Sequence, residues 1–146
     1  MKSRYFTSIA LALFLSFVLS YCSHVGSPAL QVNKTQNAVF SKHSKFAIGE
    51  IEGWPEAVGI LKGSLTNSLL NMYTEKEEDA DYIISGNIYA KRYWRTRRYV
   101  FYTINLRLAD KAGNALMSFR NEEPFMQQVI DEFTLNMVKE IKAQMK

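Results

Sequence analysis

The sequence predicts an α+β domain, a two-layer α/β sandwich in which a mainly antiparallel sheet of about four strands carries two helices on one face. The first observation is that residues 80–108 alternate apolar and polar side chains over two stretches, which is typical of half-buried antiparallel strands. The second is that residues 55–72 and 125–146 repeat apolar side chains at intervals of three and four, which is typical of amphipathic helices. Because such helices are stable only when their apolar side is covered, we expect both to lie on the sheet.

The first strand is expected at residues 45–53, where apolar residues alternate with small or polar ones. Trp54 and Pro55 end this strand and start a helix, and Glu56 lies in the first turn, where a negative charge suits the helix dipole. The apolar stripe of this helix consists of Val58, Leu61, Leu65, Leu69 and Met72. Residues 73–81 then hold five acidic side chains and are expected to form a solvated loop.

The central hairpin is expected to bury one face of each strand. This face consists of Tyr82, Ile84, Ile88, Ala90, Val100, Tyr102, Ile104, Leu106 and Leu108. A tight turn at residues 110–114, in which Gly113 or Asn114 takes a positive φ, leads to a third strand at residues 115–120. A closing helix follows over residues 125–146. Its stripe consists of Val129, Ile130, Phe133, Met137, Val138, Ile141 and Met145.

The N-terminus has the pattern of an export signal. Lys2 and Arg4 precede the run Ile9–Leu19, which is apolar apart from Ser16. This apolar core is too short for a membrane-spanning helix, which needs about 20 such residues, and it matches the core of a signal peptide. Residues 1–21 are therefore predicted to be a signal peptide.

Cys22 is the only cysteine, so the chain has no intramolecular disulfide. Leu19, Ser20, Tyr21 and Cys22 resemble the lipobox of bacterial lipoproteins, although a small residue is usual where Tyr21 stands. The resemblance implies that Cys22 becomes the lipid-modified first residue, and acyl chains such as palmitate would then hold the protein on a membrane. Ordinary secretion with a free thiol and an uncleaved N-terminal anchor are the alternatives.

Residues 22–44 are predicted to be a flexible tether, followed by the folded domain at residues 45–146. The segment is polar, has no periodicity and contains Gly26 and Pro28, so it offers little apolar surface to offset the entropy of ordering. Its two histidines, His24 and His43, have no second ligand at metal spacing. No metal site is predicted.

We expect the protein not to be an enzyme and to need no cofactor. The predicted folded domain, residues 45–146, holds no histidine that could serve as a general base, and lipidation would consume Cys22. The sequence has no glycine-rich phosphate loop of the strand–GxxxxGK–helix kind. The acidic stretch at residues 73–81 does not match the spacing of a calcium-binding loop.

The tip of the central hairpin is the candidate partner-binding site. Its candidate residues are Arg92, Tyr93, Trp94, Arg95, Arg97 and Arg98. Arginine pairs bidentately with phosphate or carboxylate, and aromatic rings supply rigid contact area, so an anionic partner is expected here. Export argues against nucleic acid, which leaves an anionic glycolipid, a membrane surface or an acidic patch of an envelope protein. Alternatively, these charges only keep exposed strand ends soluble.

The overall charge adds little to this expectation. Of the 18 basic side chains, Lys2 and Arg4 leave with the signal, so the mature chain carries 16 basic and 14 acidic groups, a net charge of +2. This excess is too small to select a partner by bulk electrostatics.

The second half of the chain resembles a group of small bacterial envelope lipoproteins. Ala80-Asp81-Tyr82, the Ile-Ile-Ser-Gly run that follows, the strand at 103–108, Asp110 with Gly113 and the strand at 115–119 are similar to the lipoprotein activators of penicillin-binding proteins and the curli-secretion lipoprotein. The chain departs from that group in its shorter lead-in before Ala80 and in Phe119, where tryptophan is common. The last 45 residues also resemble the lipopolysaccharide-assembly lipoprotein.

The resemblance implies an accessory lipoprotein of the cell envelope, anchored by its lipid to the outer membrane and facing the periplasm. Its expected role is non-enzymatic binding of another envelope component, as in an activator of a cell-wall synthase. A lipopolysaccharide or glycolipid assembly adaptor that uses the basic hairpin tip is one alternative. A structural or surface lipoprotein without a dedicated partner is another, and the oligomeric state stays open.

Overall fold

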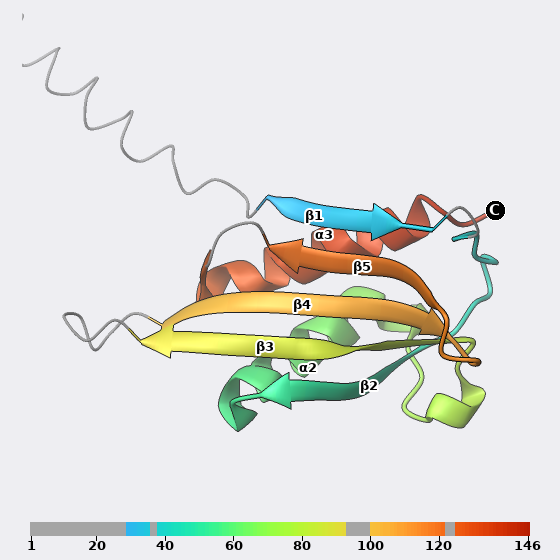
Figure 1. Ribbon diagram of the computed structural model, residues 1–146. Coiled ribbons are helices and arrows are strands. Elements are labelled where there is room, and N and C mark those ends of the chain that lie inside the picture. Colours follow the sequence, from blue (N-terminus) through green and yellow to red (C-terminus); the bar gives the residue numbers. More distant parts are fainter. Residues whose placement is uncertain (1–28, 36–37, 93–99, 122–124) are drawn as a thin grey trace, which may run out of the picture.

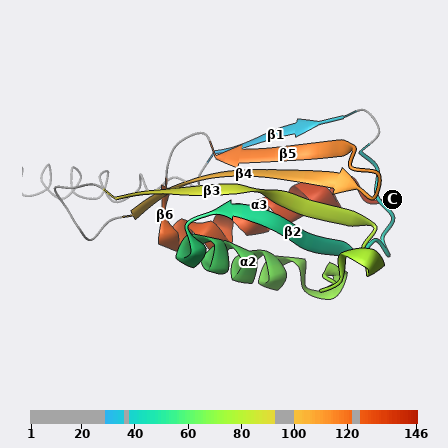
Figure 2. The same cartoon turned by 60° about the horizontal axis from the view of Figure 1, so that its bottom comes forward.

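The computed structural model describes residues 29–35, 38–92, 100–121 and 125–146. It confirms an α+β fold in which two helices cover one face of a sheet (Figures 1 and 2). The strands are β1 (Leu30–Lys34), β2 (Phe46–Gly53), β3 (Tyr82–Arg92), β4 (Val100–Asp110), β5 (Ala115–Asn121) and β6 (Phe125–Met126). The helices are α2 (Pro55–Leu69) and α3 (Ile130–Lys142), with short 3-10 turns η1 (Leu70–Met72), η2 (Glu77–Asp79) and η3 (Gln127–Val129).

The sheet is mixed and larger than predicted. Its main path runs β1-β5-β4-β3-β2, and β6 pairs with β4 beside that path, which makes six strands instead of about four. β2 pairs with β3 in parallel, whereas the other pairs are antiparallel. The reason is the connection: α2 carries the chain back along the sheet between β2 and β3, and such a crossover makes the two strands parallel.

The predicted flexible tether is wrong for residues 30–35 and 38–44, which the structure describes. β1 pairs antiparallel with β5, from Leu30 opposite Asn121 to Lys34 opposite Met117. Farther along, Phe40 is only 1% exposed and packs edge-on against Tyr82, at 4.9 Å between ring centroids. The few apolar residues here are too widely spaced to show a period, so their burial depends on surfaces supplied by distant parts of the chain.

The backbone also ties this N-terminal segment to the C-terminus. The Phe40 N–H donates to the Gln144 carbonyl at 3.0 Å, and the Lys146 N–H donates to the Phe40 carbonyl at 3.0 Å. On the surface, Lys34 Nζ lies 2.9 Å from Glu140 Oε2 on α3. The folded domain therefore begins at or before Leu30, not at Lys45.

The predicted buried faces of the hairpin and helices are confirmed where the structure describes their side chains. Between the sheet and the helices lie, among others, Leu61, Leu65, Ile84, Ile88, Ile104, Leu108, Met117, Phe119, Phe133 and Met137, each no more than 2% exposed. Between the helices, the Ser64 hydroxyl lies 2.7 Å from that of Thr134 and 2.5 Å from Asp131 Oδ1, so buried polar groups there are paired.

The closing helix starts five residues later than predicted. Phe125 and Met126 instead form β6, opposite Tyr102 and Phe101 of β4, and η3 leads from there into α3. β4 extends past the end of β5, so its backbone there needs new partners. The Asn121 side chain supplies two of them: its Oδ1 accepts from the Ile104 N–H at 2.6 Å, and its Nδ2 donates to the Tyr102 carbonyl at 3.2 Å.

The turn between β4 and β5 confirms the predicted tight turn, with Gly113 at φ +84°. Asp110 organises it, because Asn114 donates to it twice: its backbone N–H to Oδ1 at 2.8 Å and its Nδ2 to Oδ2 at 2.9 Å. The side-chain bond from Asn114, followed by the backbone bond from the same residue, holds the pKa of the Asp110 carboxyl below its ordinary value of 3.8.

Replacing Asp110 with asparagine is expected to make this turn less stable at neutral pH. An amide would present a donor to the Asn114 side chain, where the carboxylate presents an acceptor. Because the folded-state pKa is lowered, the carboxylate's contribution is present above 3.8 and is lost as pH falls through the folded-state value. Urea unfolding should therefore show the original chain as more stable at neutral pH, with the difference closing well below pH 3.8. A difference that is independent of pH would contradict this origin.

Candidate binding surfaces

The sequence-predicted site residues lie mostly outside the described part of the chain. Cys22 and the hairpin-tip residues Tyr93, Trp94, Arg95, Arg97 and Arg98 are not among the described residues. Arg92 is described by its backbone, as the last residue of β3, paired with Val100 of β4. The structure therefore fixes where the tip segment leaves and rejoins the sheet.

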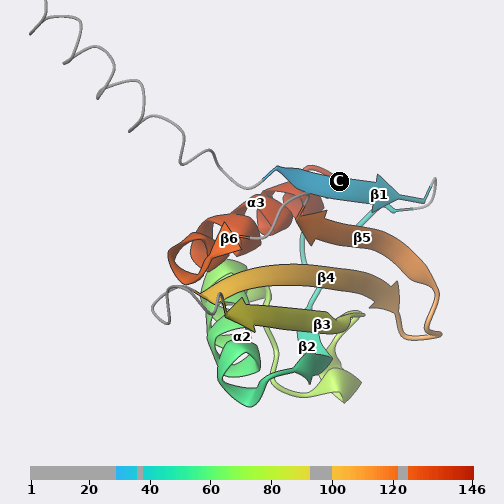
Figure 3. The same cartoon turned by 60° about the vertical axis from the view of Figure 1, so that its left-hand side comes forward.

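That end of the sheet also receives the N-terminal segment. Leu30 starts β1 opposite Asn121, whose side chain reaches the Ile104 backbone, so Leu30 lies level with Ile104 along β4. The hairpin continues four residues beyond that level to Val100, which is about 13 Å at the usual rise of a strand. Figures 1 and 3 show the start of β1 and the free ends of β3 and β4 at the same end of the domain. We call this the anchor end.

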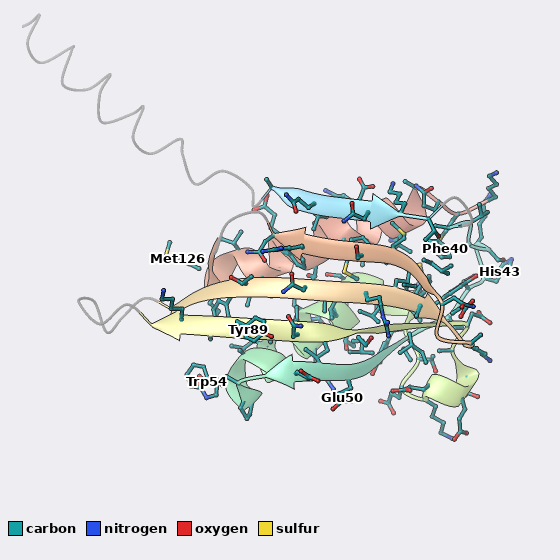
Figure 4. The ribbon with its side chains drawn as sticks, viewed as in Figure 1. Phe40, His43, Glu50, Trp54, Tyr89 and Met126 are labelled. Atoms are coloured by element: carbon teal, nitrogen blue, oxygen red, sulfur yellow. The ribbon has the colours of Figure 1, made fainter. Side chains whose placement is uncertain are left out.

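An exposed aromatic side chain adds to the anchor end. Because β2 runs parallel to β3, its last residue Gly53 points toward this end, and Trp54 follows it at the start of α2. Trp54 is 39% exposed, and Figure 4 shows it beside the end of β2. Among the described helices, none is long and apolar enough to cross a membrane.

The second surface is the face of the sheet opposite the two helices, which the described elements leave open (Figures 1 and 2). A groove of about 460 Å³ lies on this face and crosses β2, β3, β4 and β5. The side chains and backbone that line it belong to Glu50, Glu52, Ser85, Gly86, Asn87, Asn105, Leu106, Arg107 and Ser118. We call it the open-face groove.

Strand register explains how these residues meet. Glu52 lies opposite Asn87, Asn87 opposite Asn105, and Asn105 opposite Arg120, so one polar row crosses four strands. In the middle of the row, Asn105 Nδ2 donates to Asn87 Oδ1 at 2.9 Å. The two short amide side chains at the centre of this row lie between the longer charged side chains of Glu52 and Arg120, and this difference in length leaves a depression over β3 and β4.

A parallel row lies one step away. Ser85 is opposite Arg107, which is opposite Ser118. The groove thus has carboxylates on its β2 side, a guanidinium on β4, and amides and hydroxyls on β3, β4 and β5. It contains no histidine or cysteine. Among the described residues, no three His, Cys, Asp or Glu side chains are placed to hold a metal ion.

From the sequence, Ser85, Asn87, Asn105 and Arg107 are expected on the strand faces opposite the core, but nothing in it groups them with Glu50, Glu52 and Ser118 into a site. These four are ordinary polar residues on the open face of the sheet. The available signal was the recurrence of short polar residues at alternate positions, Ser85 with Asn87 and then Asn105, where strands of this length usually present larger side chains.

No protein-family model matches the chain, and no curated protein sequence matches it. Among solved structures, a PelC variant from Paraburkholderia phytofirmans, described as a dodecamer, aligns with a TM-score of 0.55 and 15% identity. The alignment covers 77% of this chain and 96% of that one. A minor lipoprotein from Acinetobacter baumannii aligns with a TM-score of 0.45 and 16% identity over 69% of this chain and 94% of its own.

TolB from Acinetobacter baumannii aligns with a TM-score of 0.41 and 14% identity, over 79% of this chain and 30% of its own. At these identities the comparisons show architecture alone, and of these three alignments it is the one with PelC, at a TM-score of 0.55, that carries the argument. The resemblance to the penicillin-binding-protein activators stays a prediction. The chain shares the fold of PelC.

Proposed function

We propose that this protein is a lipid-anchored, non-enzymatic accessory protein of the bacterial cell envelope that engages another envelope component through its anchor end. The single observation that carries the proposal is that the start of β1 and the strand ends flanking the basic segment lie at the same end of the domain. A lipid at Cys22 would bring this end, with the arginines of residues 92–98, toward the membrane.

The corrected start of the domain supports a close approach. Only eight residue steps separate Cys22 from Leu30, and an extended chain spans at most about 3.5 Å per residue, so the span is at most about 28 Å. A flexible tether over all of residues 22–44, as the sequence predicts, would place the domain at much larger distances from the membrane. With the shorter link, the basic segment stays within reach of headgroups and of membrane-embedded partners on the outer membrane.

Two partner classes fit the anchor end. A membrane-embedded envelope protein, such as a cell-wall synthase, would offer an acidic patch, and an anionic glycolipid would offer phosphates. Arginine binds both in a bidentate manner. Contacts to several phosphates of a glycolipid would weaken steeply with added salt, whereas a packed protein interface with aromatic anchors would depend on salt much less.

Replacing Cys22 with serine is expected to release the protein from the membrane fraction. Serine cannot accept the thioether-linked lipid, and each buried CH₂ of an acyl chain contributes about 0.8 kcal/mol to membrane binding. The measurement is the share of protein in membrane and soluble fractions of cells that express either chain. The unfolding midpoint of the released variant serves as the control for folding, because Cys22 precedes the described domain. Unchanged membrane retention would contradict lipid anchoring at Cys22.

The partner is tested by photo-crosslinking in whole cells. A crosslinker at position 94 should give one defined adduct, which mass spectrometry then identifies as a protein or a glycolipid. The matched control is position 111, an exposed residue in the turn at the opposite end of the sheet. Equal adducts from both positions, or none from position 94, would contradict engagement through the anchor end.

A further inference from the structure

The open-face groove is poorly suited to a protein partner. The centre of a protein interface is depleted in charged residues and enriched in aromatic anchors. Here the two central strands contribute Ser85, Asn87, Asn105 and the charged Arg107, and the carboxylates of Glu50 and Glu52 stand on the β2 side. A protein docked on this floor would desolvate many polar groups without an apolar anchor to offset their desolvation.

The open-face groove is also poorly suited to a simple anion or a metal ion. Glu50 and Glu52 stand together on one side of the groove and would repel a phosphate or carboxylate. A metal ion would need a third acidic or imidazole ligand, and the described residues supply none. The occupant should therefore be close to neutral overall and rich in hydrogen-bonding groups.

The lining offers both donors and acceptors at short spacing. The bond between the two amides uses Asn105 Nδ2 and Asn87 Oδ1, which leaves Asn87 Nδ2 to donate and Asn105 Oδ1 to accept. Arg107 donates, the two glutamates accept, and the serine hydroxyls do both. A sugar ring carries hydroxyls that also donate and accept on successive carbons, so it can pair with every member of this set.

An exposed aromatic side chain lies just beyond the groove lining, on the same face of β3. Tyr89 is two residues beyond Asn87 on β3 and therefore on the same face, at a spacing of about 6.7 Å along the strand. It is 60% exposed, and Figure 4 shows it on β3. An exposed ring offers a flat apolar surface with a polar tip, which suits the C–H face of a pyranose ring.

We infer that the open-face groove binds a neutral glycan chain, with Asn87, Asn105 and Arg107 bonded to ring hydroxyls and Tyr89 stacked on an adjoining sugar. The volume of about 460 Å³ lies within the range of small-ligand sites, and its open form admits a chain that continues past both ends. The groove residues lie on the open face of the sheet and are not among the candidate residues 92–98 of the anchor end, so the inference goes beyond the proposed function and can fail without it.

The test uses the mature chain with Cys22 replaced by serine and three soluble probes: maltotetraose, cellotetraose and tetra-N-acetylchitotetraose. Amide NMR at millimolar sugar should show saturable shifts in β3 and β4 with at least one probe. Tyr89→Ala and Arg107→Ala, both at exposed positions, should each weaken binding about tenfold or more, since each removes a direct contact. Asn105→Ala should do the same. The matched control, Asn136→Ala on α3, should leave binding unchanged.

Added salt separates this ligand class from charged ones. Binding of a neutral glycan should change less than about twofold between low and high ionic strength, because screening acts on charges. Three outcomes would overturn the inference: no groove shifts with any of the probes, binding that survives both Tyr89→Ala and Arg107→Ala, or affinity that collapses with salt. None of these outcomes would change the expected release of Cys22→Ser from the membrane, so the proposed function is tested separately.

Discussion

Alanine in place of Gly86 is expected to lower the free energy of unfolding by at least about 3 kcal/mol, and to leave much of the chain unfolded. Gly86 lies in the middle of β3 with φ +153°, a conformation that L residues rarely adopt. An added Cβ would stand 2.1 Å from the Asn105 carbonyl oxygen and 3.0 Å from the Leu106 Cα. Both are backbone atoms of β4, so relief requires the two central strands to separate.

The matched control is Gly59→Ala in α2. Apart from its chain neighbours and the backbone of its own helix, no atom lies within 4 Å of a Cβ built there, so the substitution meets no obstacle. In a helix interior the change is expected to stabilise the protein by about 0.5–1 kcal/mol. Urea unfolding of both variants checks the pair. A Gly86→Ala chain as stable as the original would contradict the close approach of β3 and β4.

Alanine in place of Phe40 is expected to cost about 3–5 kcal/mol, although the residue lies in a stretch that looks like a tether. The Phe40 ring is 1% exposed and lies 4.9 Å from the Tyr82 ring and 6.0 Å from the Phe46 ring. Its removal would leave a cavity at the point where the N-terminal segment, β2 and β3 meet.

The neighbouring residue supplies the control for that prediction. Val39 is 49% exposed, so Val39→Ala should change stability by no more than about 0.5 kcal/mol. Thermal or urea unfolding of the two variants is sufficient. If Phe40→Ala were as harmless as Val39→Ala, residues 38–44 would not be part of the folded domain.

The elements that could be predicted are those with a strong local period. α2, β3, β4 and β5 follow from repeats of apolar residues within each segment, because a helix or a half-buried strand dictates that spacing. β1 and Phe40 could not be found in this way. Their stability comes from β5, Tyr82 and the C-terminal residues, which are distant in sequence, and a short edge strand carries too few residues to display a period.

The direction of β2 relative to β3 and the first residue of α3 also depend on contacts between residues that are distant in sequence. The sequence indicates a strand at β2 followed by a helix, but the parallel pairing with β3 follows from the crossover that α2 makes. α3 begins later than predicted because β4 extends beyond the end of β5, and Phe125 and Met126 pair with that part of β4 as a strand. The apolar repeat within one segment does not reveal that a distant strand needs a hydrogen-bonding partner.

The two candidate surfaces differ in how much of each could be predicted from the sequence. The basic, aromatic segment is visible from composition alone, and the structure adds the position of its flanking strand ends. The open-face groove depends on register, because Glu52, Asn87, Asn105 and Arg120 come together only when four strands are aligned. No single strand carries that information.

The intact mass of the mature protein, extracted from cell membranes, tests the central claim most directly. We predict a chain that begins at Cys22 and carries the added mass of a diacylglyceryl group and a further acyl chain on this residue. An unmodified chain that begins beyond Cys22, or a chain that retains residues 1–21, would contradict the account of a lipid-anchored envelope protein.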